Sequence, residues 1–179
     1  MPADRIPLVP TLTTPRFTLR PLERGDAAAL LPTLSDPAQC RYLTRPAFAS
    51  QEELRGWLAE PGWPGRTWIA QDARGVAGRF VAVPFEEDAR VFEIGYITCI
   101  ERLREGVARE CMTALIAQLW REGARLITAE IDTRNAPSIR LAQALGFACV
   151  KTVREAEISH IGPCDLVFYE LHSPHVQHG

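Results

Sequence analysis

The chain has 179 residues, of which 46% are hydrophobic and 23% charged, values typical of a folded globular protein and not of a disordered one. This length favours a single domain with its own core. The formal net charge of -2 argues against a module that binds nucleic acid by neutralising phosphates, so no nucleic-acid partner is expected.

The first half of the chain predicts a strand, two helices and a three-stranded meander. Alternating residues predict a strand at 16–22, after which Asp26 is expected to cap a helix that runs to about Leu34. Ser50 followed by Glu53 is a capping-box pattern for a second helix. The meander strands are expected at 67–71, 76–84 and 91–99.

The second half alternates helices and strands. Apolar residues at helical spacing between Glu105 and Glu122 predict the longest amphipathic helix, and a strand is expected at 124–133. The segment NAPSIRLAQALGF then predicts a short helix, because Asn135 can accept from first-turn amides and Gly146 suits a left-handed residue after the last turn. Two antiparallel strands are expected at 148–158 and 164–171. This order predicts an α/β sheet with antiparallel and parallel parts, and chemistry is expected at the strand-to-helix junction before Asn135.

The cysteine pattern and the chain ends add three expectations. Five cysteines without a Cys-x-x-Cys pair favour free thiols over disulfides or a zinc site. No apolar run approaches the roughly 18 residues needed to span a bilayer, so a cytoplasmic protein without a membrane partner is expected. His172, His175 and His178 could form a metal site, but a frayed terminus is the stronger expectation and no metal is predicted.

Three motifs resemble the GNAT N-acetyltransferase superfamily. They are the late helix with Asn, Ser and a closing Leu-Gly-Phe, the sequence EIGY at 93–96 and the sequence TLRPL at 18–22. Together they are most similar to the branch that acetylates the N-termini of ribosomal proteins, and the likeness covers 12–171.

The resemblance implies an architecture and domain bounds. We expect a single GNAT-like domain at 12–172, with a mixed, mostly antiparallel central sheet whose central strands splay apart and with helices on its flanks. Residues 1–11 would be an N-terminal extension and residues 173–179 a C-terminal tail.

The resemblance also implies acetyl-CoA as a cosubstrate. A GNAT enzyme lays the pantetheine arm beside exposed strand backbone, and the pyrophosphate sits on amides at the start of the next helix. Asn135 could hold the arm or a bridging water, and Arg140 could reach the phosphates or simply point to solvent. The other residues implied in binding are Ile97, Thr98, Cys99, Arg104, Gly106, Val107, Ala108 and Arg109.

The helix start departs from the family's Arg-Gly-x-Gly loop. Leu103 stands where the arginine belongs and Arg104 at the first glycine, so only Gly106 survives. A positive φ at Arg104 would cost roughly 1 kcal/mol or more. Glu105 adds negative charge beside the expected pyrophosphate, which Arg102, Arg104 and Arg109 could offset. Two functions therefore stay open: a working acetyltransferase, or a ligand-binding or regulatory module of the same fold without catalysis.

For the enzyme, the resemblance suggests three catalytic residues. Glu93 is the candidate base, with an ordinary carboxylate at a sheet edge as the alternative. Asn135 could position the cofactor arm while it caps its helix. Ser138 could face the thiol or be a plain first-turn hydroxyl, and Tyr169 is a weaker candidate acid. The acceptor would be a primary amine of a small molecule or of a peptide N-terminus, and the sequence leaves a homodimer open.

Overall fold

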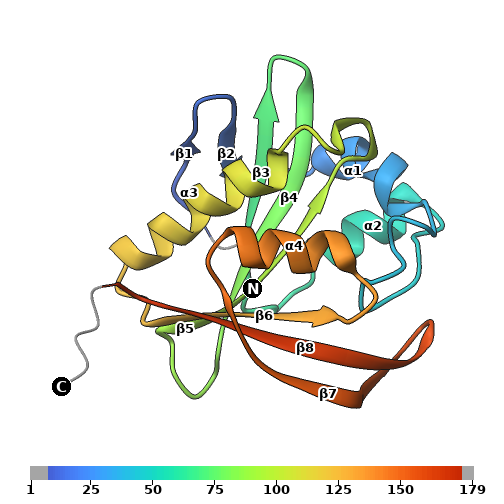
Figure 1. Cartoon of the computed structure of the whole chain (residues 1–179). Helices are drawn as coiled ribbons and strands as arrows, with labels where there is room; N and C mark the ends of the chain where they lie inside the picture. The colour runs from blue at the N-terminus through green and yellow to red at the C-terminus, as the bar shows by residue number, and fades with distance from the viewer. Residues whose placement is uncertain (1–7, 175–179) are drawn as a thin grey trace.

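A computed structural model describes residues 8–174 and shows an eight-stranded sheet with helices on both faces (Figure 1). The spatial order of the strands is β1-β2-β3-β4-β5-β6-β8-β7, and every neighbouring pair is antiparallel except β5 and β6. The strands are β1 (Leu12–Thr13), β2 (Thr18–Pro21), β3 (Arg66–Asp72), β4 (Gly75–Pro84), β5 (Val91–Thr98), β6 (Leu126–Asp132), β7 (Ala148–Ser159) and β8 (Gly162–His172). The helices are α1 (Asp26–Leu34), α2 (Gln51–Leu58), α3 (Val107–Arg121) and α4 (Ala136–Ala144), with a 3-10 turn η1 (Ile100–Arg102).

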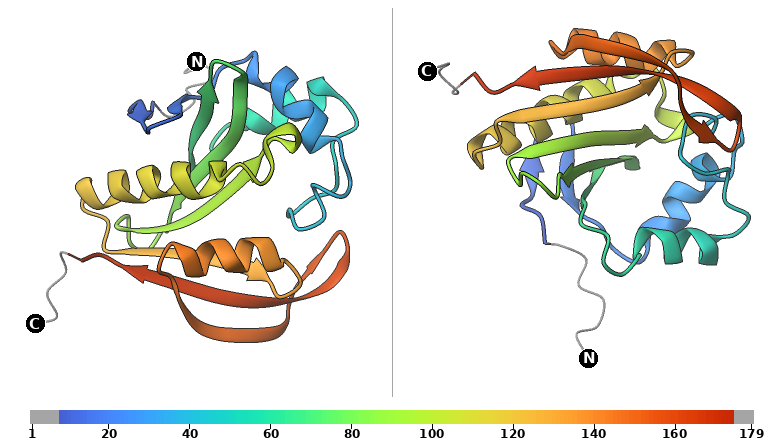
Figure 2. Two further views of the ribbon diagram at one scale, coloured as in Figure 1. Left: turned by 45° about the horizontal axis from the view of Figure 1, so that its top comes forward. Right: turned by 90° about the horizontal axis from the view of Figure 1, so that it is seen from below.

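The central strands β5 and β6 separate soon after they meet. Their parallel register begins at Val91 and Leu126 and ends at Glu93 and Thr128, although both strands continue beyond that pair. β6, β8 and β7 carry the sheet onward on the far side of the gap (Figure 2). The predicted mixed, mostly antiparallel sheet with splayed central strands is therefore confirmed.

Each face of the sheet has its own apolar core. On the first face α3 and α4 pack over sheet residues such as Phe80 and Ile127, with Leu115 of α3 in the same core. On the second face α1 and α2 pack with Leu30 and Leu54 against the other side of β3. Since β5 lies between these layers, alternate side chains of this one strand reach different environments.

The helix starts confirm two of the three predicted caps. Ser50 Oγ accepts from the Glu53 amide at 3.1 Å, as the capping box predicts. Asn135 caps α4 by accepting from the Ser138 amide at 3.4 Å. The prediction for Asp26 is wrong, because α1 begins at this residue and its carboxylate instead accepts from Arg20 at 2.7 Å and from the Glu23 amide at 2.7 Å.

Several other expectations meet the structure here. All five cysteines carry free thiols, as predicted. The two-residue strand β1 and the turn η1 were not predicted, because neither is long enough to show a periodic pattern. Within residues 8–174 no helix combines the length and apolar character needed to cross a bilayer. His175 and His178 lie outside the described residues, and the domain bounds drawn from the resemblance stay predictions.

Candidate active site

Alternation along β5 sends neighbouring side chains to opposite faces of the sheet. Ile97 packs against the core under α1 and α2, whereas Ile94 and Tyr96 pack against the core under α3 and α4. Glu93 is an even number of residues from Ile97 and three from Tyr96, so it shares the face of Ile97 and opposes that of Tyr96. A molecule in the gap between β5 and β6 would thus meet Glu93 from one side of the sheet and Tyr96 from the other.

Glu93 stands where the two central strands part. It pairs with Val83 on β4 and with Thr128 on β6, the last residue pair before the gap. β5 has a strand on each side, so Glu93 does not lie at a sheet edge, and its role as the base stays a prediction. Burial, and then the charges of Glu130 and Glu157, raise the pKa of Glu93 above its ordinary value. This carboxyl group holds a proton more readily than an exposed glutamate does.

The pocket in front of Glu93 is acidic. It lies between the 41–44 segment and β5, β6, β7 and β8, and its charged lining is Arg41 together with Glu93, Glu130, Asp132 and Glu157, so acids outnumber bases. Asp132 binds Arg134 at 2.6 Å, which lowers its pKa to about 2, so this charge is compensated. For Glu93, Glu130 and Glu157 the described part of the chain supplies no ion-pair partner. The pocket suits a positively charged group.

The start of α3 keeps the backbone shape that two glycines would give. Gly106 precedes the helix with φ of 75° and Arg104 has φ of 65°, so both are left-handed. No side chain caps α3, and the first-turn amides at 107–109 therefore have no acceptor in the helix. Arg104 and Arg109 are exposed and form no ion pair within 8–174. This end of α3 can accept an anion.

The left-handed conformation of Arg104 makes a stability prediction. An L-residue in this conformation costs about 1–2 kcal/mol, of which glycine's greater freedom in the unfolded chain cancels about 0.5–1 kcal/mol. We expect Arg104→Gly to raise the free energy of unfolding by about 0.5–1 kcal/mol in urea titrations. Arg104→Ala is the matched control, because it removes the same side chain but keeps Cβ. Equal stabilities of the two variants would rule out backbone strain as the cause.

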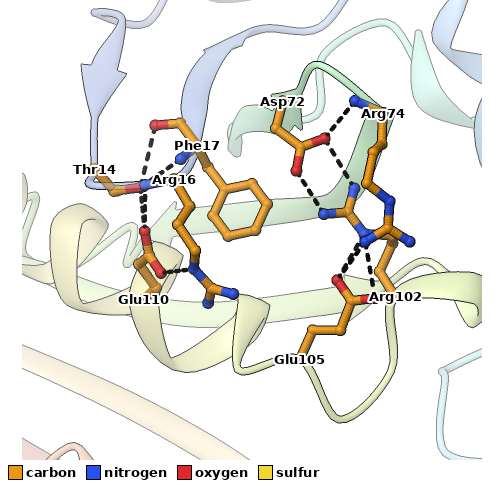
Figure 3. A network of polar contacts seen from close by, with 8 residues as sticks. All are labelled: Thr14, Arg16, Phe17, Asp72, Arg74, Arg102, Glu105 and Glu110. Atoms are coloured by element: carbon orange, nitrogen blue, oxygen red, sulfur yellow. Dashed lines mark hydrogen bonds and ion pairs between the residues drawn. The ribbon is translucent and has the colours of Figure 1, made fainter.

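A network of charges fixes the loop before α3 (Figure 3). Arg102, which is only 5% exposed, binds the Asp72 carboxylate at 3.1 and 2.6 Å and the Glu105 carboxylate at 2.9 Å. Arg74 also binds Glu105, at 3.0 Å. These bonds hold the pKa of Glu105 below its usual range, Arg102 contributing most. The charge of Glu105 is thus offset by Arg102, as expected, and by Arg74, which lies 31 residues away and was missed.

The second carboxylate near this helix start is also engaged (Figure 3). Glu110 accepts from Thr14 Oγ1 at 2.7 Å and from Arg16 Nε at 2.7 Å. It also accepts from the Arg16 amide at 2.9 Å. These bonds tie α3 to the β1–β2 connection. Glu105 and Glu110 thus each have an arginine partner.

The predicted strand backbone divides between the gap and the neighbouring strand. The Cys99 amide donates to Ala77 on β4 at 2.9 Å, and the Cys99 carbonyl accepts from the Arg102 amide at 2.8 Å. Backbone groups alternate between the two sides of an antiparallel strand, so those of Ile97 also face β4 and those of Thr98 face the gap. By the same alternation the backbone groups of Tyr96, which the sequence did not single out for cofactor binding, also face the gap.

The start of α4 brings three polar side chains together. The Asn135 side chain holds the Ser138 amide, and Ser138 Oγ lies 2.9 Å from the Tyr96 hydroxyl. Arg140 is exposed on the same helix. Tyr169 is only 4% exposed within the core, so its weaker candidacy as an acid is not supported. Tyr96 was missed because its contact with Ser138 spans 42 residues.

Comparisons with known proteins agree with this architecture. The family model described as the acetyltransferase (GNAT) domain matches residues 16–148. The chain is 31% identical over 156 residues to the uncharacterized protein YkkB of Bacillus subtilis, covering 80% of this chain and 88% of that protein. It is 28% identical over 169 residues to the uncharacterized N-acetyltransferase p20 of Bacillus licheniformis, covering 90% and 95% of the two chains.

Solved structures show the same fold. A GNAT-family acetyltransferase from Bacillus anthracis superposes with a TM-score of 0.83 at 20% identity, over 92% of this chain and 99% of that one. RimL, a ribosomal L7/L12 alpha-N-protein acetyltransferase solved with coenzyme A, superposes with a TM-score of 0.79 at 20% identity, over 91% and 98%. The predicted likeness to ribosomal-protein acetyltransferases is thus confirmed in the fold. The chain belongs to the GNAT acetyltransferase family.

Proposed function

We propose that this protein transfers an acetyl group from acetyl-CoA to a primary amine. The observation that carries the proposal is the position of Glu93, a half-buried carboxyl group at the point where the central strands part, inside an acidic pocket. Such a pocket attracts an ammonium group, and a carboxylate with a raised pKa can take a proton from it.

The residues around the gap fit acetyl-CoA as the cosubstrate. The uncapped amides of Gly106, Val107 and Ala108 and the exposed Arg104 and Arg109 would hold its phosphates. The backbone of Thr98 would lie beside the pantetheine arm, and Asn135 would steady it. When bound, the cosubstrate supplies an acetyl group on a thiol leaving group. RimL, similar in fold, was solved with coenzyme A.

Each candidate catalytic residue has a task in this reaction. Glu93 receives the proton of the acceptor ammonium, directly or through water. Ser138, at the first turn of α4, donates a hydrogen bond toward the departing sulfur. Asn135 orients Ser138 because its side-chain Oδ1 accepts from the Ser138 backbone amide at 3.4 Å. No covalent intermediate on the protein is required, because the amine attacks the thioester directly.

A non-catalytic ligand-binding module remains the competing function, because Leu103 replaces the family's loop arginine. Two measurements decide between them. Calorimetric titration with acetyl-CoA should give saturable binding at micromolar concentration, and a panel of primary amines should release thiol only with the correct acceptor. Absence of binding up to millimolar acetyl-CoA would exclude the enzyme. Binding of acetyl-CoA without release of its thiol in the presence of polyamines, amino-terminal peptides or small amines would favour the module.

Asn135 separates a cap from a catalytic role. Asn135→Ala should lower the free energy of unfolding by about 0.5–1 kcal/mol through loss of the cap, and should also lower turnover. Asn135→Asp keeps an acceptor for the Ser138 amide but loses the donating amide, so its stability should stay close to that of the wild type while turnover still falls. Urea titration and thiol-release kinetics measure the two effects. Wild-type turnover in Asn135→Asp would leave Asn135 as a cap alone.

A further inference from the structure

The strongest unassigned feature of the site is the pair of hydroxyl groups on Tyr96 and Ser138. Their oxygens lie 2.9 Å apart and join β5 to α4 on the face opposite Glu93. The Tyr96 ring stacks on Phe80 with centroids 6.3 Å apart and planes 13° apart. The phenol is thus held by a ring at its side and by a hydrogen bond at its tip, which fixes its direction.

The chemistry of α4 explains why a phenol is needed there. The polar side chains of this helix are Ser138, Arg140 and Gln143, and none of them is an acid that ionises near neutral pH. A serine hydroxyl alone is a poor proton donor to a thiolate. A phenol has an ordinary pKa of about 10, only roughly 1.5 units above that of a thiol at about 8.5, so a phenol is a far better proton donor to a thiolate than a serine hydroxyl is. Burial raises the pKa of Tyr96, and its bond to Ser138 partly lowers it.

We propose that Tyr96 is the proton source for the leaving thiolate and that its proton travels through Ser138. This inference rests on the proposed acetyl transfer. As the C–N bond forms and the C–S bond breaks, the electron pair of that bond moves to sulfur. Ser138 gives its hydroxyl proton to sulfur and takes the phenolic proton of Tyr96. The phenolate then regains a proton from water. The acceptor ammonium loses two protons in all: Glu93 takes the first before attack and passes it to water, and it takes the second from the nitrogen once the C–N bond has formed.

The strand geometry supports this division of labour. Glu93 and Tyr96 lie three residues apart on β5, so they project from opposite faces of the sheet. Beyond Glu93 the pairing between β5 and β6 ends, and a substrate lying between the two strands would be reached from both faces. The base therefore meets the amine on one side and the proton donor meets the sulfur on the other.

Tyr96→Phe tests the proposal because it removes one oxygen. We expect kcat to fall about 10- to 100-fold, with the Kd for coenzyme A changed less than about twofold. The alkaline decline of the kcat profile, at the pH where the phenol ionises, should disappear. Ser138→Ala should lower kcat similarly, whereas Ser138→Thr, which keeps a hydroxyl, should retain activity. The double variant Tyr96→Phe/Ser138→Ala should be no slower than the slower single variant, since the two hydroxyls act as a unit. Tyr169→Phe is the matched control and should keep wild-type kcat.

A second measurement uses the protein without cosubstrate. Ultraviolet difference titration follows the ionisation of the three tyrosines, and the transition absent in Tyr96→Phe belongs to Tyr96. Ser138→Ala should raise that pKa, because the bond that lowers it is gone. An unmoved transition would show that the two hydroxyls are not coupled.

The outcomes separate this inference from the function on which it rests. A wild-type protein that binds no coenzyme A and releases no thiol overturns both. An active wild type whose kcat is unchanged by Tyr96→Phe overturns the proton path and leaves acetyl transfer standing. A Tyr96→Phe variant that loses affinity for coenzyme A, with kcat preserved at saturation, shows that Tyr96 only shapes the binding site.

Discussion

Glu93→Gln should lower kcat by about 10²- to 10⁴-fold at neutral pH, the usual contribution of a general base. The substitution keeps the size of the side chain and removes its ability to accept a proton. Affinity for coenzyme A should stay unchanged, because the phosphates are expected at the start of α3 and not at Glu93. Steady-state kinetics and calorimetric binding of coenzyme A measure the two effects. A variant with wild-type kcat would exclude Glu93 as the base.

The pH dependence sharpens this prediction. Glu93 acts in its ionised form, so activity should rise with pH through its pKa, which burial and the charges of Glu130 and Glu157 place above the ordinary range. Glu157→Gln is the matched comparison: it removes one of those charges and keeps the base. We expect it to move the acid limb of the rate profile to lower pH, and an unmoved limb would mean that another group controls it.

The same shift predicts a stability gain for Glu93→Gln. A raised folded-state pKa contributes stability that is present below the unfolded pKa and is lost as pH rises through the folded pKa. At neutral pH the ionised Glu93 therefore destabilises the fold, and the glutamine variant should melt at a higher temperature. The difference should vanish in acid, where both side chains are neutral. Loss of activity together with gained stability is typical of a functional carboxylate.

Arg102→Ala should give the second large effect. Without this buried guanidinium, the carboxylates of Asp72 and Glu105 lose their strongest partner beside the start of α3. We expect the melting temperature to fall and the Kd for coenzyme A to rise by about tenfold or more, because anionic groups then face the phosphates. Thermal unfolding and calorimetric titration test both effects.

Two companion variants separate charge from structure in this network. Arg74→Ala removes a mostly exposed partner of Glu105 and should change the Kd only slightly, as exposed ion pairs contribute little. Arg102→Ala/Glu105→Gln should regain part of the affinity if freed negative charge is the cause. An equal Kd for Arg102→Ala with and without Glu105→Gln would assign the loss to loop disorder instead.

Local sequence patterns predicted the elements with strong signals. The capping box at Ser50, the cap at Asn135 and the left-handed Gly146 each depend on neighbours within a few residues, and all three are found. Asp26 failed as a cap because its carboxylate is held by Arg20 and by the Glu23 amide, both of which lie outside the helix.

The parts of the site that the sequence did not reveal depend on contacts between distant segments. Arg74 compensates Glu105 only because the fold brings the β3–β4 turn to the loop before α3, and Tyr96 meets Ser138 only because the fold brings the start of α4 to β5. The positive φ of Arg104 was expected solely from the resemblance, since nothing in an arginine side chain favours it. Residue spacing predicts neighbours along an element, whereas packing decides neighbours across elements.

The three residue pairs that join β5 to β6 have a mechanical consequence. They make the sheet two half-sheets connected by a short seam, with α3 and α4 bridging the break on one face. A ligand arm lying along that break would complete the backbone pairing as an additional strand does. A bound ligand would then couple the two half-sheets and stabilise the folded protein.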